Sequence, residues 1–125
     1  QPRSRGLGDV YKRQVLRGWR ALYPADAHHA VMERVSAMPG QGTSSVFSLG
    51  HSLGAVQGVV STLGIPHELV APTAWKRAMG LSADKAEAQA MASQLFPAHA
   101  GLWATKNRAD RAEAALLAAW AWRQR

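Results

Sequence analysis

Apolar residues recur along this chain at helical spacing in several segments, separated by two short runs that suit β-strands. A helical stripe marks residues 15–23, a longer one marks residues 43–63, and further helices are predicted at 72–80, 84–97 and 110–122. The apolar positions of the long stripe are Val46, Leu49, Leu53, Val56, Val59 and Val60, and those of the last helix are Leu116, Leu117 and Trp120.

Capping residues indicate where these helices begin. Thr43 or Ser44 is expected to cap the long helix, and Ser82 or Asp84 the alanine-rich helix that follows. Pro72 suits the first turn of its helix, because its missing N–H would have no partner there in any case.

The two β-capable runs, residues 29–35 and 67–71, lie on either side of the long helix. A crossover of this length makes the second strand parallel to the first, so the pattern predicts a β-α-β unit. Two strands are too few for a self-sufficient α/β sheet that serves four or five helices. We therefore predict an incomplete α/β fold that lacks its first β-strands.

Three glycines, Gly50, Gly54 and Gly58, lie four residues apart on the long helix. Each costs up to about 1 kcal/mol relative to alanine in a helix. The row therefore predicts that a sheet or another helix approaches the backbone closely there.

Composition narrows the chemistry. The chain has 125 residues, no cysteine, and 15 Lys and Arg against 8 Asp and Glu. Without thiolates a metal would be held by oxygen or imidazole, which favours a hard ion such as Mg²⁺. The excess of positive charge favours a polyanionic partner, and a solvated basic surface is the alternative. No stretch is long and apolar enough to cross a bilayer, and no signal sequence is evident, so we expect a cytoplasmic protein.

Residues 1–14 follow neither a strand nor a helix pattern, and they contribute four basic residues against one acid. The string GLGDVYKRQ looks like translated adaptor sequence. We expect residues 1–14 to be a non-native or disordered leader, with a native flexible arm as the alternative, and residues 15–125 to be the later part of a larger, N-terminally truncated domain.

One local motif suggests a serine hydrolase. Gly50-His51-Ser52-Leu53-Gly54 has the G-x-S-x-G form of a nucleophile elbow, and Asp84 and His99 follow in the expected order. However, the residues before the motif look like the capped first turns of a helix rather than a strand. We therefore interpret Ser52 as a helix residue and keep the hydrolase as a less favoured alternative.

A second constellation consists of carboxylates. Asp110 and Glu113 are three residues apart, so they share one face of the last helix, and Glu33 lies in the first strand. Crowded carboxylates repel each other, and a divalent cation supplies the opposing charge. Two metal ions so held can activate a water and stabilise a leaving oxygen in phosphodiester cleavage. The alternative is that Asp110 and Glu113 only cap the helix.

Several segments, in order, carry a resemblance to a known family. They are Glu33-Arg34-Val35, Met38 to Gly42, Phe47 and Gly50, Gly64-Ile65-Pro66, Pro72 to Leu81, Leu95-Phe96-Pro97 and Arg111 to Ala114. Across roughly residues 15–125 the chain resembles the RuvC-like Holliday junction resolvases, or crossover junction endodeoxyribonucleases.

The resemblance implies a ribonuclease H-like fold and the cutting of branched DNA in recombination and repair, with Mg²⁺ or Mn²⁺ held by acidic residues. Glu33 matches the acid of the family's central strand, and Asp110 and Glu113 match the closing pair on its last helix. The family's first acid has no counterpart here. We therefore expect this chain alone to cut DNA poorly or not at all, and a remnant that only binds DNA is the alternative.

Basic residues near these positions are expected to contact phosphates. They are Lys76, Arg77, Lys106, Arg108 and Arg111. The resemblance also implies a homodimer on the two-fold junction. Trp75 and Trp120 are expected in the core, Trp122 at a former interface, and none of the histidines is assigned to metal.

Overall fold

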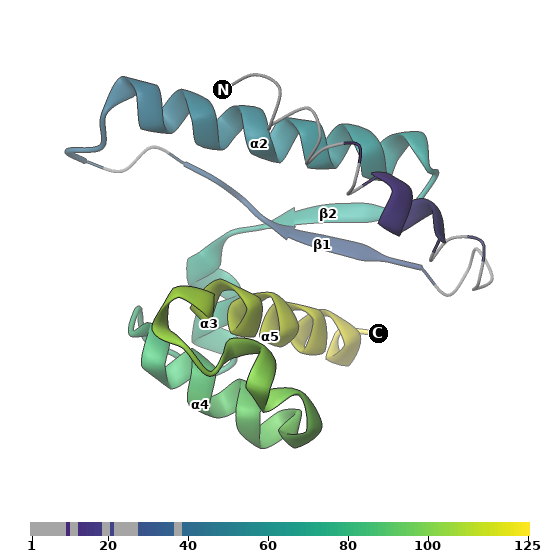
Figure 1. The fold of residues 1–125 in the computed structure, drawn as a ribbon. Helices are drawn as coiled ribbons and strands as arrows, with labels where there is room; N and C mark the ends of the chain where they lie inside the picture. The colour runs from purple at the N-terminus through teal and green to yellow at the C-terminus, as the bar shows by residue number, and fades with distance from the viewer. Residues whose placement is uncertain (1–9, 11–12, 19–20, 22–27, 37–38) are drawn as a thin grey trace. The chain divides into compact units, whose positions relative to one another are not determined.

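The computed structural model describes residues 10, 13–18, 21, 28–36 and 39–125. They form a mixed α/β structure that is mostly helical, with a small sheet of two parallel strands (Figure 1). The chain divides into two compact units, Gln1–Leu69 and Val70–Arg125. Within the described residues, no helix is both long and apolar enough to span a membrane.

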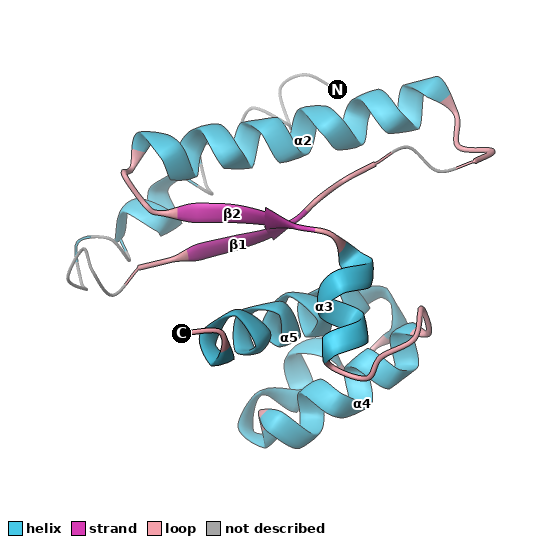
Figure 2. Ribbon diagram, turned by 180° about the vertical axis from the view of Figure 1, so that it is seen from behind, coloured by secondary structure: helices cyan, strands magenta, loops and turns pink. Residues whose placement is uncertain are grey.

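The first unit contains the predicted β-α-β arrangement. Strand β1 (Ala30–Glu33) is followed by helix α2 (Thr43–Thr62) and strand β2 (His67–Val70), and the two strands pair directly (Figure 2). The pairing starts where Ala30 N–H donates to the Pro66 carbonyl at 2.8 Å. Both predicted strands are therefore confirmed, each somewhat shorter than expected.

Helix α2 begins and packs differently from the prediction. Gly42 is its N-cap, no side chain bonds the free amides there, and Thr43 is already helical, so the expected cap at Thr43 or Ser44 was wrong. A side-chain cap requires the residue before the first helical turn to carry the oxygen, and glycine has none. Of the residues in this fully described helix, only Val60 is buried.

The glycine row has no packing partner in the described part of the first unit. A Cβ built on Gly50, Gly54 or Gly58 would meet no heavy atom within 4 Å. The predicted close approach at these positions was therefore wrong. Glycine is needed instead at Gly64, whose φ of +68° lets the chain leave α2 and enter β2.

The second unit is helical. It comprises α3 (Pro72–Ala78), α4 (Lys85–Leu95), two 3₁₀ helices η2 (Pro97–Trp103) and η3 (Lys106–Arg108), and α5 (Ala109–Arg123). The last helix was predicted within one residue at each end, Pro72 is in the first turn of α3 as predicted, and Asp84 caps α4 by accepting a bond from Ala86 N–H at 3.0 Å.

Small residues let α4 and α5 approach closely. Ala92 on α4 and Ala112 on α5 are completely buried, and Ala88 is nearly so. Among the described residues, Trp75 and Leu116 are the largest side chains with no exposed surface, and burying a side chain of leucine size contributes roughly 2 kcal/mol. The expectation for Trp75 is confirmed, whereas Trp120 is only half-buried.

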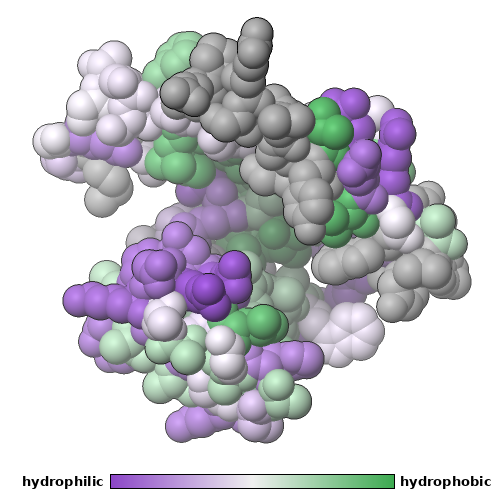
Figure 3. All heavy atoms as spheres, viewed as in Figure 1, coloured by the Kyte–Doolittle hydropathy of each residue, from purple (hydrophilic) through white to green (hydrophobic). Residues whose placement is uncertain are grey.

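The surface of this unit is mixed. On the face seen in Figure 3, hydrophilic and hydrophobic side chains alternate over the helices of the second unit without a single dominant patch. Trp122 is 76% exposed, so it does not contribute to the core.

Two predictions concern the start of the chain. Val10, Arg13 and Gln14 are helical, and the expectation of a non-native or disordered leader at residues 1–14 stays a prediction. The predicted helix at 15–23 is observed at residues 13–18 and 21, and Trp19, Leu22 and Tyr23 lie outside the described residues.

Candidate functional site

The acidic pair lies at the start of α5. Asp110 is in the first turn of the helix and its side chain is 83% exposed, whereas the Glu113 side chain is only 12% exposed. Glu113 follows the fully buried Ala112, and this part of α5 is covered by α3 and α4. One carboxylate therefore faces water and the other is largely enclosed.

Two lysines from different helices meet this pair. Lys76 Nζ of α3 lies 2.8 Å from Glu113 Oε2. Lys85 Nζ of α4 lies 2.6 Å from Asp110 Oδ1 and 3.3 Å from Glu113 Oε1. The single ammonium of Lys85 thus joins both carboxylates, which confirms that Asp110 and Glu113 share a face of the helix.

The electrostatics follow from these contacts. The pKa of Lys85 is raised above its ordinary value of 10.5, chiefly because Nζ donates a hydrogen bond to Asp110, with further contributions from Glu113 and against the opposing effect of burial. Glu113 Oε1 is enclosed, and its contact with Lys85 at 3.3 Å is an ion pair rather than a well-aligned hydrogen bond. The lysines therefore supply the positive charge that the crowded carboxylates need.

The alternative that the pair caps its own helix finds no capping hydrogen bond, although Asp110 lies in the first turn, where a carboxylate complements the helix dipole. Arg108 is the N-cap of α5, and no side chain bonds the free amides there. Asp110 lies past the capping position, in the first turn, and its carboxylate bonds Lys85 of another helix instead.

Glu33 is the last residue of β1 and is half-buried. It belongs to the first unit, whereas Asp110 and Glu113 belong to the second. Only the acidic pair is brought together within one unit. In the part of the chain that the structure describes, no group of three or more His, Asp or Glu side chains is arranged to hold a metal ion.

The five predicted phosphate contacts differ in their surroundings. Lys76 is paired with Glu113, and Arg111 donates to the Leu102 carbonyl at 3.3 Å. Arg77, Lys106 and Arg108 are exposed. Lys106 and Arg108 form the ends of η3, directly before the helix that carries the acidic pair. The basic surface at this site is therefore centred on η3.

Sequence reasoning missed Lys85. It is the first residue of α4, where the helix dipole disfavours a positive charge. A lysine as the first residue of a helix is unfavourable unless a carboxylate outside that helix pairs with it. Lys85, directly after the cap Asp84, could therefore have indicated such a partner. The two 3₁₀ helices between α4 and α5 were also not predicted.

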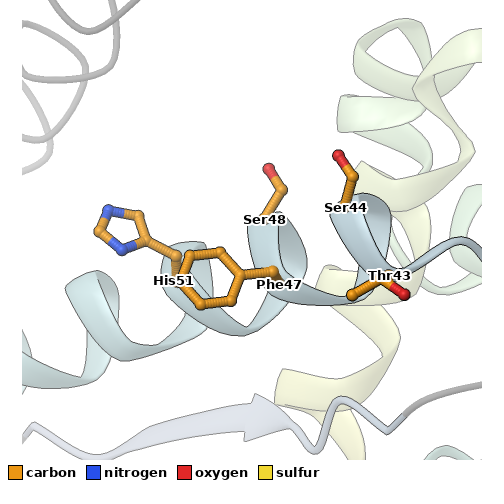
Figure 4. A pocket seen from close by; sticks show the side chains of 5 residues that line it. All are labelled: Thr43, Ser44, Phe47, Ser48 and His51. Atoms are coloured by element: carbon orange, nitrogen blue, oxygen red, sulfur yellow. The ribbon is translucent and has the colours of Figure 1, made fainter.

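The interpretation of Ser52 as a helix residue is confirmed. Ser52 lies inside α2 and is exposed, and the segment before it is helical rather than a strand. A nucleophile elbow needs a sharp strand-to-helix turn at the serine. An open hollow on this helix is lined by Thr43, Ser44, Phe47, Ser48 and His51, with Ser44 and Ser48 projecting in the same direction (Figure 4).

The sequence was compared with known proteins. No protein-family model matches the chain, and no curated protein is significantly similar to it.

Proposed function

We propose that this chain works as a metal-dependent, structure-selective endodeoxyribonuclease of the RuvC-like Holliday junction resolvase type, with a ribonuclease H-like fold. Its substrate would be branched DNA in recombination and repair, and its cofactor Mg²⁺ or Mn²⁺. The observation that carries the proposal is the convergence of Asp110 and Glu113 on one cation, the Lys85 ammonium.

The chemistry of the donor set fits a hard divalent ion. Carboxylate oxygens are the preferred ligands of Mg²⁺, and Asp110 and Glu113 already present one oxygen each to a single positive centre. Glu33, on β1 of the first unit, is the third carboxylate that the family resemblance implies. When bound, the metal would activate water and stabilise the leaving oxygen of the phosphodiester.

The residues of the chain itself have separate tasks in this proposal. Lys76 fixes the enclosed Glu113 by pairing with its Oε2 at 2.8 Å, while Oε1 lies 3.3 Å from Lys85 Nζ. Lys106 and Arg108, exposed on η3, would hold backbone phosphates beside the start of α5. The formal net charge is +7, and residues 15–125 keep +4 of it (11 basic against 7 acidic residues), which supports a polyanionic substrate.

The proposal is tested with a four-way DNA junction and the purified chain. Junction binding is measured with Mg²⁺, with Ca²⁺ and with a chelator, and cleavage is measured with Mg²⁺ and Mn²⁺. We expect junction binding that divalent ions strengthen, together with weak or no cleavage. Glu33→Gln, Asp110→Asn and Glu113→Gln should each remove the increase in junction binding that divalent ions cause, and any cleavage.

Glu68→Gln is the matched control, since Glu68 is exposed on β2 and pairs with His29 at 3.3 Å. Glu68→Gln should leave the increase in junction binding caused by divalent ions unchanged. Junction binding that is indifferent to divalent ions and to all three acidic substitutions would overturn the nuclease proposal.

A second candidate is a protein that binds branched DNA without cutting it. Both carboxylates of α5 are already paired with lysines, so they do not need a metal ion to balance their charge. Lys106 and Arg108 of η3 are exposed and are not the partners of these carboxylates, which favours a surface that binds phosphates without cutting. In that case Lys106→Met and Arg108→Met would weaken binding and lower its salt dependence, and the acidic substitutions would not.

A homodimer is part of the nuclease proposal, since a four-way junction has two-fold symmetry. Trp122, 76% exposed near the end of α5, is the candidate contact. Sedimentation of the unchanged chain and of Trp122→Ser tests this contact. We expect a dimer for the unchanged chain and a monomer for Trp122→Ser, and a monomer in both cases would contradict the proposed dimer.

A further inference from the structure

Lys85 occupies an electrostatically awkward position in α4. It is the first helical residue, directly after the cap Asp84, where the unpaired amides of the helix already carry partial positive charge. A cation placed there is disfavoured by its own helix. Its side chain instead crosses to α5 and reaches the two carboxylates at 2.6 Å and 3.3 Å. The compensating partner of Lys85 is therefore the acidic pair.

The two lysines of the network are not equivalent. Lys76 is 21% exposed, lies 5.7 Å from the centre of the Trp75 ring and contacts Glu113 Oε2. Lys85 is 57% exposed and contacts Oε1 together with Asp110. Lys76 is held by packing as well as by charge, whereas Lys85 can leave for solvent at small cost. The two lysines also occupy different oxygens of the same carboxylate.

We propose that Lys85 is a built-in counter-cation that holds the metal position of the acidic pair, and that a divalent cation must displace it. This inference rests on the proposed function. In the metal-free chain the ammonium neutralises Asp110 and Glu113 Oε1 and ties the start of α4 to the start of α5. In the metal-bound chain Lys85 turns to solvent, and Lys76 remains on Oε2 as a positioning residue.

A consequence is that Lys85 lowers the affinity of the pair for metal. A divalent ion has to break the two contacts of Lys85 before it gains the two oxygens. Because Lys85 is more than half exposed, water screens this competition, and we expect removal of the charge to strengthen binding by only about fivefold.

The test measures Mn²⁺ binding by calorimetry, without DNA, to the full chain and to Lys85→Met. Arg125→Met is the matched control, because it removes one positive charge from the exposed far end of the same unit. Lys85→Met should bind Mn²⁺ more tightly, and Arg125→Met should match the unchanged chain. Asp110→Asn in either background should weaken binding.

A second readout uses Mg²⁺ and NMR of the lysine side chains. The Lys85 side-chain signals should shift toward those of a solvent-exposed lysine as Mg²⁺ is added, while the signals of Lys76 stay nearly constant. Loss of both responses in Asp110→Asn would assign them to the acidic pair.

The outcomes separate the inference from the function on which it rests. Mn²⁺ binding that depends on Asp110 but is unchanged or weakened in Lys85→Met overturns the role of Lys85 alone. Absence of Mn²⁺ binding in both the unchanged chain and Lys85→Met overturns the metal site and the inference with it. Binding seen only in Lys85→Met would show that the ion does not displace Lys85 in the unchanged chain, which overturns the inference.

Discussion

Lys76 Nζ of α3 lies 2.8 Å from Glu113 Oε2 of α5, and both side chains are mostly withdrawn from water. We expect Lys76→Met to lower the free energy of unfolding by roughly 1–3 kcal/mol, because it leaves an enclosed carboxylate with one fewer cation. Chemical denaturation measures the loss.

The neighbouring Arg77→Met serves as the comparison, since Arg77 is exposed, and it should change the stability by less than about 0.5 kcal/mol. The double variant Lys76→Met/Glu113→Gln should recover part of the loss. If the double variant is as unstable as the sum of the two single ones, the pair is not coupled.

Gln89 of α4 forms hydrogen bonds with the segment that leads to α5. Its side-chain amide donates to the Trp103 carbonyl at 2.8 Å and to the Thr105 carbonyl at 2.9 Å. Gln89→Ala should cost about 1–3 kcal/mol, because both carbonyls lose the Gln89 amide and the Thr105 carbonyl keeps only its bond from Arg108 N–H. Gln94→Ala, at an exposed position of the same helix, is the control and should be neutral. Equal effects of the two substitutions would show that the bonds contribute nothing.

The start of α4 is expected to depend on pH through Glu87. Its carboxylate accepts from Ser82 N–H at 3.0 Å and from Ser82 Oγ at 2.8 Å, and these bonds lower its pKa below the ordinary value of 4.5, the backbone bond most. A lowered folded pKa means that the contribution to stability is complete above the ordinary value and is lost as the pH falls through the folded pKa.

NMR titration of the Glu87 carboxyl carbon checks the direction of that shift. Ser82→Ala removes only the hydroxyl, so it should restore the smaller part of the shift and leave the part due to the backbone bond. If the pKa of Glu87 returned completely to 4.5 in Ser82→Ala, the backbone hydrogen bond would not be the larger cause of the shift.

Two glycines should respond in opposite ways to alanine. Gly80 has a φ of +71°, which alanine adopts only with strain, so Gly80→Ala should destabilise the chain by about 1 kcal/mol or more. Gly54 lies in α2 with open space around its Cβ position, so Gly54→Ala should stabilise by up to about 1 kcal/mol. Thermal unfolding measures both. Destabilisation by Gly54→Ala would restore the idea that another element approaches the glycine row.

The elements that local patterns specify were predictable from the sequence. Pro72 and Asp84 mark helix starts through their own backbone and side-chain chemistry, and the two strands follow from their flanking turns and the helix between them. The cap of α2 was not predictable in the same way, because the choice between Gly42 and Thr43 depends on where the backbone turns.

The candidate site was predictable only in part. That Asp110 and Glu113 share a face follows from helical spacing, but the identity of their partners is a tertiary matter. Lys85 is 25 residues from Asp110 in the sequence, and no local rule joins them. The spatial relation of Glu33 to the pair is likewise set by tertiary structure alone.

The double hydrogen bond of Gln89 also bears on how such a chain can change over evolutionary time. It ties the carbonyls of Trp103 and Thr105 to one side chain, so a single residue of α4 bonds both ends of the connection between η2 and η3. An insertion there would shift Lys106 and Arg108 out of register with the start of α5. We therefore expect insertions and deletions to be rare in this connection, even where its amino acids vary.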